Sequence, residues 1–292
     1  MSPTLPTPLV TTSWLADHLD DPDLRILDAT YMLSSLKRDA AAEYKEGHIP
    51  GAIFFDIDKI ARDDTDLPHM VPSPEQFAEL VGDLGIGSGH RIVAYDTFGL
   101  FSAARAWWLF RLYGHDAVAV LDGGLKRWRQ EGRPIDQGAV ALSKAEFAPE
   151  FRPSLLRSVE QIQQIVDNGT ERVMDVRSLG RFAGEEPELR PGVRPGHIPG
   201  AGNLPYADLI DPDTGEVRPP AAVAPRLAEA GIAGDTPIVA SCGSGVTACI
   251  LALAVFRDQG RDIPVYDGSW TEWGGRQDLR IETGPPAANK AP

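Results

Sequence analysis

The stretch EGHIPGAIFF at residues 46–55 returns as PGHIPGAGNL at residues 195–204, and this recurrence decides how the chain divides. Three more landmarks recur in the same order: LRILDAT (24–30) with RVMDVRS (172–178), RIVAYD (91–96) with PIVASC (237–242), and LDGGLKRW (121–128) with YDGSWTEW (266–273). The period is nearly constant, since it is 149 residues between the two HIPGA histidines and 146 between the last residues of RIVAYD and PIVASC. A long constant period indicates two homologous domains in tandem.

Short apolar runs alternate with longer segments of helical periodicity within each copy. In the first copy we expect strands at 26–27, 92–95 and 117–121, and helices at 73–84 and 103–113. Apolar strands separated by helices predict an α/β fold, in which each domain is a parallel β-sheet flanked by helices. Ligands of such sheets bind outside the carboxyl ends of the strands, where Asp96 and Cys242 fall.

The domain limits follow from composition. Residues 131–154 are rich in proline, glycine and small side chains, as an interdomain linker is, and place the boundary near residue 148. We predict four segments, and they are an N-terminal domain (8–135), a linker (136–156), a C-terminal catalytic domain (157–282) and a disordered tail (283–292).

Charge and hydropathy exclude several classes of function. The 292 residues include 28 Lys and Arg against 42 Asp and Glu, for a net charge of -14, which argues against nucleic acid or an anionic membrane as a partner. No apolar run approaches the roughly 20 residues of a membrane span, and the first residues, MSPTLPTPLV, lack the pattern of a signal peptide. We therefore expect a cytoplasmic protein. Two cysteines without a CxxC pair argue against zinc, so we predict neither metal nor cofactor.

Both cysteines fall in SCGSGVTAC (241–249), between an expected strand and a buried helix expected at 248–259. Gly243 and Gly245 free the backbone to curl so that successive N–H groups point inward, and the start of the helix adds its positive dipole end. A sulfur at position 242 would lie in that concavity as a thiolate. Spacing alone leaves a second interpretation open, in which Cys242 is only a small buried apolar residue.

The repeat favours a reactive Cys242. Its counterpart is Asp96, whose loop, DTFGLFSAAR, lacks the paired glycines, so only one copy is equipped to hold an anion. Cys249 lies among apolar helix residues and is interpreted as part of the core. Residues kept by both copies are better explained by the fold than by catalysis, and this set is His48, His197, Trp128 and Trp273.

The tandem landmarks together with CGSGVTA resemble the two-domain sulfurtransferases of the rhodanese superfamily over roughly residues 8–280. Thiosulfate-specific members usually carry basic residues after the cysteine, whereas the neutral Gly243 and Ser244 resemble the 3-mercaptopyruvate sulfurtransferases. The resemblance implies that Cys242 takes sulfur from 3-mercaptopyruvate as a persulfide, releases pyruvate, and passes the sulfur to cyanide or to a thiol such as thioredoxin. Thiosulfate is the alternative donor.

The resemblance also assigns roles to individual residues. In SLGRFAGEEPELRPG (178–192), Arg181 and Arg190 would bind the substrate's carboxylate and keto group, although an isolated arginine is more often a solvated surface residue. The backbone of the loop would bind the sulfur and substrate through Gly243, Gly245, Val246 and Thr247. A proton relay is implied for Ser244, His69 and Asp58, although from the residues alone a histidine such as His69 is more often a surface or interface group.

Two other hypotheses, a phosphatase and a binding module without activity, fit the sequence less well. Phosphatases with this type of loop carry an arginine six positions after the cysteine, and Ala248 stands there, which excludes them. A rhodanese-like binding module without activity is disfavoured because Cys242 is present. Phe101 departs from the family, which often has tyrosine at that position, and this bears on substrate preference. We expect a monomer or a weak dimer.

Overall fold

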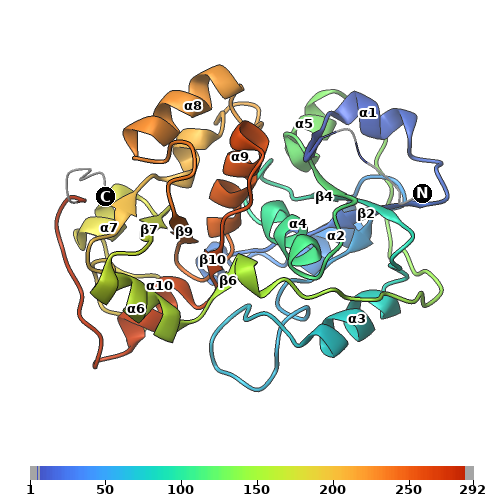
Figure 1. Cartoon of the computed structure of the whole chain (residues 1–292). Helices are drawn as coiled ribbons and strands as arrows, with labels where there is room; N and C mark the ends of the chain where they lie inside the picture. Colours follow the sequence, from blue (N-terminus) through green and yellow to red (C-terminus); the bar gives the residue numbers. More distant parts are fainter. Residues whose placement is uncertain (1–4, 6, 287–292) are drawn as a thin grey trace. The chain divides into compact units, whose positions relative to one another are not determined.

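The computed structural model describes residue 5 and residues 7–286 of the chain. The last part of the predicted tail, residues 287–292, lies outside the described residues. The chain forms two compact units (Figure 1). The N-terminal unit holds the described residues through Asp64, with Val71–Arg152 and Asp211–Val217, and the C-terminal unit holds Thr65–Met70, Pro153–Ile210 and the residues from Arg218 onward. Each unit contains one copy of the sequence repeat.

The N-terminal unit is built on a five-stranded parallel sheet of order β1-β5-β4-β2-β3. Its strands are β1 (Leu9–Val10), β2 (Leu24–Asp28), β3 (Ile53–Phe54), β4 (Arg91–Tyr95) and β5 (Val118–Leu121). Its helices are α1 (Thr12–Asp17), α2 (Ala40–Glu46), α3 (Pro74–Asp83), α4 (Ala103–Leu112) and α5 (Gly124–Gln130).

The C-terminal unit repeats this plan with a second five-stranded parallel sheet, of order β6-β10-β9-β7-β8. Its strands are β6 (Leu156–Arg157), β7 (Arg172–Asp175), β8 (Gly202–Asn203), β9 (Ile238–Ser241) and β10 (Val265–Tyr266). Its helices are α6 (Val159–Asn168), α7 (Leu179–Ala183), α8 (Pro220–Glu229), α9 (Ala248–Gln259) and α10 (Ser269–Gly275).

The two sheets have the same topology, since β1 corresponds to β6, β5 to β10, β4 to β9, β2 to β7 and β3 to β8. The register agrees as well, because Asp28 lies opposite Tyr95 in one sheet and Asp175 lies opposite Ser241 in the other. The predicted α/β fold with two parallel sheets is confirmed. Asp96 and Cys242 each follow the central strand, at the carboxyl edge where ligands of parallel sheets bind.

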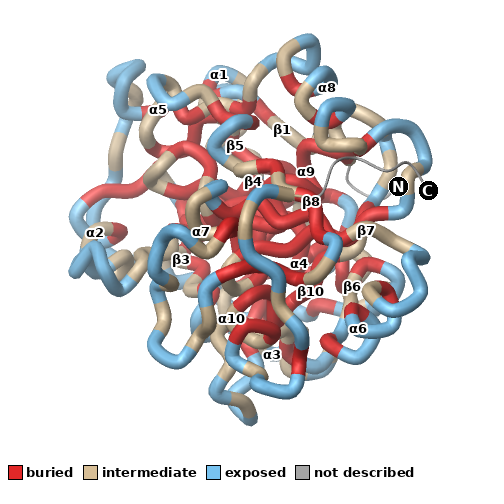
Figure 2. The backbone as a smooth tube through the Cα atoms, turned by 90° about the vertical axis from the view of Figure 1, so that its left-hand side faces the viewer, coloured by how far each residue is buried: buried red, intermediate tan, exposed pale blue. Residues whose placement is uncertain are grey.

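Local signals explain where the helices begin and end. Ser73 caps α3 by accepting the N–H of Gln76, and Pro74 occupies the first turn, where its missing N–H costs nothing. Helix α9 spans the predicted residues, and it ends at Gly260, whose φ of 68° is left-handed. Helices α4 and α9 carry few polar residues because each is buried along nearly its whole length (Figure 2).

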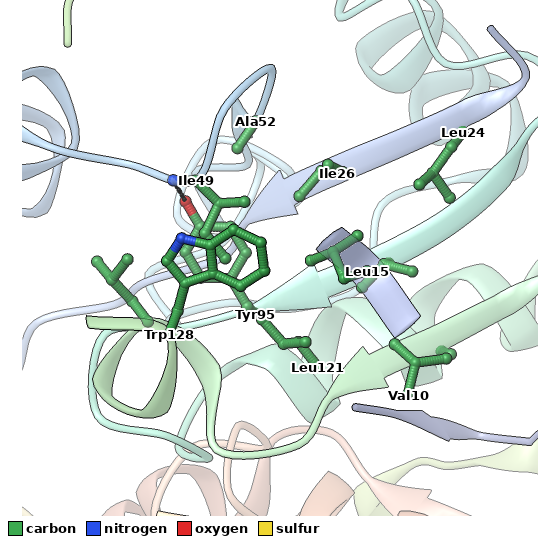
Figure 3. Close-up of a cluster of buried hydrophobic side chains, with 12 residues drawn as sticks. Val10, Leu15, Leu24, Ile26, Ile49, Ala52, Tyr95, Leu121 and Trp128 are labelled. Carbon is green, nitrogen blue, oxygen red and sulfur yellow. Dashed lines mark hydrogen bonds between the residues drawn. The ribbon is translucent and has the colours of Figure 1, made fainter. Parts of the chain in front are cut away.

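Each unit has its own apolar core under its sheet. In the N-terminal unit this core includes Leu15, Ile26 and Trp128, and the Tyr95 hydroxyl accepts the N–H of Ile49 within it (Figure 3). In the C-terminal unit the matching tryptophan is Trp273. Burying side chains of this size contributes about 1.5–3 kcal/mol each, so the cores dominate the stability of both units.

The residues shared by both copies have structural contacts. The indole N–H of Trp128 donates to the carbonyl of Pro134, and that of Trp273 donates to the carbonyl of Arg280. His48 and His197 stack on Tyr44 and Phe182 respectively, and the Nδ1 atom of each ring hydrogen-bonds a backbone carbonyl. These contacts agree with the structural roles predicted for the two histidines and two tryptophans.

The segment predicted as a linker packs against the N-terminal unit over much of its length. The backbone of Asp136 pairs with that of His48, and the N–H of Ala145 donates to the carbonyl of Gly82. A Cβ at position 82 would lie only 2.7 Å from the Ala145 carbonyl oxygen, which explains the glycine there. The predicted limits 8–135, 136–156 and 157–282 stay predictions. In the part of the chain described, no helix is both long and apolar enough to span a membrane.

Candidate active site

Cys242 directly follows β9, the central strand of the C-terminal sheet, and only 1% of it is exposed. A tight turn over the next five residues leads into α9. Gly245 has a φ of 76°, a left-handed value that residues with a Cβ adopt only at a cost, so this glycine is required by the turn. The predicted strand, glycine turn and helix are therefore all present around Cys242.

Most backbone N–H groups of this turn have no protein partner in the described part of the chain. Among the described residues, the N–H groups of five positions donate to no acceptor, and they are Gly243, Ser244, Val246, Thr247 and Ala248. Unpaired N–H groups at the start of a buried helix attract an anion, and the helix dipole adds to that attraction. The loop is thus a cradle for negative charge at the position of the sulfur.

The equivalent loop of the N-terminal unit shows what this backbone shape binds. The carboxylate of Asp96 accepts the N–H groups of Phe98, Phe101, Ser102 and Ala103 at 2.7–3.0 Å. By the spacing of the repeat, three of these donors match Ser244, Thr247 and Ala248. The N-terminal loop is therefore filled by its own carboxylate, whereas the C-terminal loop holds a thiol and open donors.

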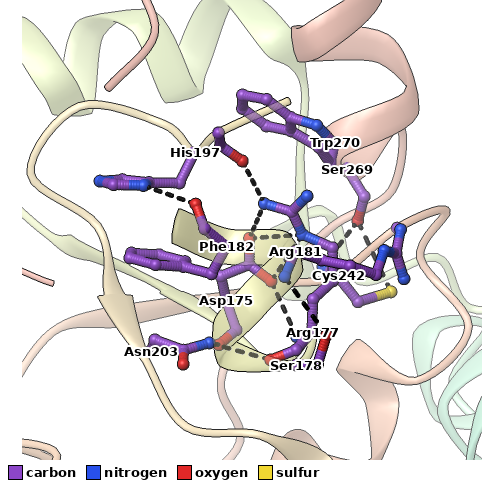
Figure 4. Close-up of polar contacts among 12 residues, drawn as sticks. Asp175, Arg177, Ser178, Arg181, Phe182, His197, Asn203, Cys242, Ser269 and Trp270 are labelled. Carbon is purple, nitrogen blue, oxygen red and sulfur yellow. Dashed lines mark hydrogen bonds and ion pairs between the residues drawn. The ribbon is translucent and has the colours of Figure 1, made fainter. Parts of the chain in front are cut away.

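Ser269 completes the turn and was not predicted. Its Oγ accepts the N–H groups of Cys242 and Gly245, at 3.2 and 3.1 Å, and lies 4.0 Å from the Cys242 sulfur. Figure 4 shows Ser269 beside Cys242. The Ser269 hydroxyl donates to the carbonyl of Tyr266 at 2.8 Å. The φ of Ser269 is 49°, which is strained for a non-glycine residue and matches the 52° of its counterpart Gly124. The change from DGG to DGS was the available sequence signal.

A buried ion-pair chain lies beside the cysteine loop in the C-terminal unit. Arg177 donates from Nε and Nη2 to the Asp175 carboxylate, and from Nη2 to the carbonyl of Gly196 at 2.7 Å. Its Nη1 pairs with Glu188 at 2.6 Å, and its guanidinium lies 4.7 Å from the centre of the Trp270 ring. Burial lowers the pKa of Arg177, but Asp175 and Glu188 outweigh it and the net shift is upward.

Glu188 links this buried arginine to Arg181, one of the predicted substrate ligands. The second Glu188 oxygen accepts Nη2 of Arg181 at 2.6 Å (Figure 4 shows Arg181 near Cys242). A Cβ added at Gly243 would lie 3.4 Å from Nη2 of Arg181, so the guanidinium lies against the backbone of the cysteine loop. Its Nε is buried and has no hydrogen-bond partner. Sequence reasoning found Arg181 but missed Arg177 and Glu188.

The other predicted residues are less tightly held. Arg190 is half-buried and forms no hydrogen bond or ion pair with the described residues. Ser244 is half-buried, and its hydroxyl has no hydrogen-bond partner among those residues, so no hydrogen bond joins it to His69. His69 is buried, with a φ of 60°, in the same unit as Cys242, whereas Asp58 is exposed in the N-terminal unit.

The remaining sequence predictions also have a place in the structure. Cys249 is fully buried on α9, and its thiol donates to the carbonyl of Gly245 at 3.3 Å, behind the turn. Phe101 lies in the Asp96 loop and its ring packs edge-on against Phe98. Across the described residues, no group of three or more His, Cys, Asp or Glu side chains could hold a metal ion.

Comparisons with known proteins agree with this architecture. The rhodanese-like domain model matches residues 11–131 and again residues 158–276. The human 3-mercaptopyruvate sulfurtransferase is 42% identical, with 93% of each chain covered. The Escherichia coli protein of the same name is 40% identical over 94% of this chain and 97% of its own. A crystal structure of an E. coli 3-mercaptopyruvate sulfotransferase superposes with a TM-score of 0.82 at 38% identity, covering 90% and 99% of the two chains.

The chain therefore belongs to the rhodanese family, with two domains of that fold. Its similarity to curated sulfurtransferases extends over more than nine-tenths of its length, so it is an enzyme of the sulfurtransferase class. The resemblance predicted from the repeat landmarks and the cysteine loop is confirmed.

Proposed function

We propose that the protein takes the sulfur atom of 3-mercaptopyruvate onto Cys242 and passes it to a thiol or to cyanide. The observation that carries this proposal is the ring of unpaired backbone N–H groups around a buried cysteine, with Arg181 against the same loop. The relatives named 3-mercaptopyruvate sulfurtransferase, at 40–42% identity, support the choice of donor.

The first step is attack of the Cys242 thiolate on the substrate sulfur. A sulfur–sulfur bond forms, the carbon–sulfur bond breaks, and its electron pair leaves with the organic fragment as the enolate of pyruvate, which takes up a proton. The five open N–H groups of the loop, at Gly243, Ser244, Val246, Thr247 and Ala248, stabilise the negative charge on the sulfur throughout, as preorganised donors stabilise an oxyanion in other enzymes. The N–H of Gly245 is held by Ser269 and takes no part. The open donors bind the outer sulfur of the persulfide in the same way.

The arginines supply positive charge that this acidic protein otherwise lacks at the site. A guanidinium binds a carboxylate through two parallel hydrogen bonds, which suits Arg181 and Arg190 to the carboxylate and keto oxygen of mercaptopyruvate. Glu188 holds Nη2 of Arg181 and leaves its buried Nε without a partner. A substrate oxygen would satisfy that donor, which favours Arg181 as the tighter of the two contacts.

Proton transfer to the enolate is assigned to Ser244, His69 and Asp58. Ser244 carries a hydroxyl without a partner among the described residues, and His69 belongs to the unit that holds Cys242. In this proposal the Asp58 carboxylate orients the imidazole, and the imidazole exchanges a proton with the substrate through Ser244. The acceptor is a thiol such as thioredoxin, and the protein works in the cytoplasm as a monomer or weak dimer.

Thiosulfate is the second candidate donor. A relative from Arabidopsis thaliana, 42% identical, is named thiosulfate/3-mercaptopyruvate sulfurtransferase and is mitochondrial. The absence of a basic side chain at Gly243 and Ser244 favours the keto acid donor, because the thiosulfate dianion gains more from added positive charge. A cyanide assay with both donors tests this choice, and thiosulfate turnover well above that with mercaptopyruvate would overturn it.

The persulfide itself is tested by intact-protein mass after incubation with mercaptopyruvate. A gain of one sulfur atom, absent in Cys242→Ser and retained in Cys249→Ser, is the expected result. If the wild-type protein gains no sulfur, the chain acts as a binding module and the proposed chemistry is wrong.

The roles of the arginines need a readout that separates substrate binding from the fold. Arg181→Ala and Arg190→Ala should lower mercaptopyruvate turnover much more than they lower the rate at which iodoacetamide, a neutral reagent, alkylates Cys242. Equal losses in both measurements would mean that the arginines maintain the loop and do not bind the substrate.

A further inference from the structure

The N-terminal unit contains a cavity of about 160 Å³ at the carboxyl edge of its sheet. It is lined by Asp28, Thr30, Ala40, Glu43, Tyr44, Glu46, Gly47, Thr97, Leu125 and Arg129. None of these residues takes part in the proposed sulfur transfer. An engineered cavity of about 150 Å³ in another protein binds benzene, so this space can hold a planar ligand of similar size.

The same place in the C-terminal unit is occupied by the side chain of Arg177. The repeat pairs four cavity residues with Arg177 and its three neighbours, namely Asp28 with Asp175, Thr30 with Arg177, Gly47 with Gly196, and Leu125 with Trp270. Asp175 and Gly196 accept hydrogen bonds from the guanidinium, and Trp270 lies under it. Because Thr30 stands where Arg177 stands, the cavity has the position of the missing guanidinium.

The two carboxylates are held in the same way. The N–H of Thr30 donates to Oδ1 of Asp28 at 3.0 Å, and the N–H of Arg177 donates to Oδ1 of Asp175 at 2.9 Å. Each aspartate is the last residue of its strand and is 2–3% exposed. The difference lies in the cation, since Asp175 has a guanidinium beside it and Asp28 forms no ion pair with any described residue.

The charge of the cavity favours a positive ligand. Three carboxylates line it, from Asp28, Glu43 and Glu46, against the guanidinium of Arg129. Glu43 is already paired with Arg38 at 2.6 Å, so the negative charge without an ion pair to the described residues comes from the other two carboxylates. Arg129 donates to the carbonyl of Gly47 at 2.9 Å and so satisfies the acceptor that Arg177 meets in the other unit, but it forms no ion pair with Asp28. Burial raises the pKa of Asp28, and hydrogen bonds involving Thr30 and Tyr95 offset only part of that effect.

We propose that the N-terminal domain binds a small guanidinium compound in this cavity, with the Asp28 carboxylate as its principal partner. The planar ligand would lie as the end of Arg177 lies in the other domain, with two N–H groups on the carboxylate and one face on Leu125. Glu46 would add a second negative charge near the ligand. The ligand is either a free small molecule or an arginine side chain of a peptide, and both present the same group.

The test is calorimetric titration of the full-length protein with methylguanidinium, at constant ionic strength set by sodium chloride. Methylammonium, which has the same charge without the planar fork, is the matched ligand control. We expect methylguanidinium to bind at least about tenfold more tightly than methylammonium, because only the fork can make two bonds to one carboxylate. Equal affinities, or no saturable binding of methylguanidinium, would overturn the proposal.

Three variants locate the site. Thr30→Arg supplies the guanidinium from the chain itself, as Arg177 does, and should abolish methylguanidinium binding while raising the thermal midpoint of the N-terminal unit. Asp28→Asn should weaken binding by at least about tenfold because it removes the charge. The Thr30 hydroxyl also accepts the N–H of Thr97, so replacing Thr30 removes a bond of the fold as well. Glu46→Gln, at the rim of the cavity, keeps that bond and should weaken methylguanidinium binding less than Asp28→Asn does.

If one of these variants folds poorly, the others still test the proposal. A folded Asp28→Asn that binds methylguanidinium as tightly as the wild type would overturn the proposal, as would undiminished binding by folded Thr30→Arg. Titration with the peptide Gly-Arg-Gly separates the two sources of the ligand. Tighter binding of the peptide assigns the site to an arginine side chain, and tighter binding of methylguanidinium assigns it to a free small molecule.

Discussion

The loops that follow β4 and β9 start at equivalent positions, but they differ in what their backbone N–H groups bind. In the N-terminal unit, four N–H groups converge on the carboxylate of Asp96. In the C-terminal unit, Ser269 accepts the N–H groups of Cys242 and Gly245, and the other five donors of the Cys242 loop have no protein partner among the described residues. The donors of the N-terminal loop stabilise the folded loop, whereas in the proposed reaction the open donors of the C-terminal loop bind the anionic sulfur.

At a second pair of equivalent positions, the C-terminal unit is filled and the N-terminal unit is open. In the C-terminal unit, Arg177 fills the space beside Asp175, whereas in the N-terminal unit Thr30 leaves that space open beside Asp28. The two copies of one fold are therefore open at different places, one around a cysteine and the other beside a carboxylate. In the proposal above, the copy without the cysteine keeps a binding site of another kind.

The largest expected effect comes from replacing the first residue of each loop, Cys242 or Asp96. Cys242→Ser should reduce turnover by about 10³-fold or more, because the nucleophile is lost while the donors remain. Turnover is measured as thiocyanate formed from mercaptopyruvate and cyanide. When Asp96→Cys is introduced into the Cys242→Ser background, intact-mass analysis should show no gain of sulfur. A stable persulfide at position 96 would mean that the N-terminal loop can also hold a reactive sulfur.

The next effect concerns stability. Asp96→Ala leaves four backbone donors without their carboxylate and should lower the free energy of unfolding of the N-terminal unit by about 3–5 kcal/mol. Cys242→Ala removes no acceptor of this kind and should cost about 1 kcal/mol or less. Urea unfolding followed by tryptophan fluorescence measures both. Similar losses in the two variants would mean that the Asp96 carboxylate does not organise its loop.

Ser269 sharpens the comparison because Gly124 stands at the same point in the other unit. Ser269→Ala removes the acceptor of two buried N–H groups and keeps the positive φ, so it should cost about 1–3 kcal/mol and reduce turnover about tenfold. Ser269→Gly removes the same acceptor but relaxes the strained backbone and should cost less stability. If Ser269→Gly is less stable than Ser269→Ala, the backbone of Ser269 is not strained.

The smallest effect is expected at Glu272, whose counterpart is Arg127. Burial raises the pKa of Glu272, and the Tyr266 hydroxyl donates to its carboxylate at 2.9 Å. A raised pKa means that the folded state binds a proton more tightly than the unfolded state, so wild-type stability falls as pH rises through this window. Glu272→Gln should therefore raise the thermal midpoint near pH 8 and leave it unchanged near pH 4. An equal shift at both values would exclude ionisation as the cause.

Several parts of the site could be predicted because their signals are local. The apolar run before Cys242, the glycines after it and Gly260 define a strand, a turn and the helix α9 within one short segment. The repeat then identified Asp96 as the counterpart of the cysteine. Ser269 was missed although it lies 4.0 Å from the sulfur, because the two residues are 27 positions apart in the sequence and only the pairing of β9 with β10 brings them together.

The sequence by itself determined that this chain has two copies of one α/β fold and that one copy keeps a cysteine in a glycine turn, because repeat spacing and hydrophobic periodicity are written along the chain. Only the tertiary structure decided which side chains meet at the carboxyl edges of the two sheets. The bond from Glu188 to Arg181, the strained Ser269 and the cavity beside Asp28 all depend on the direction of side chains from different strands and loops. Those directions follow from packing, which brings together residues far apart in the sequence.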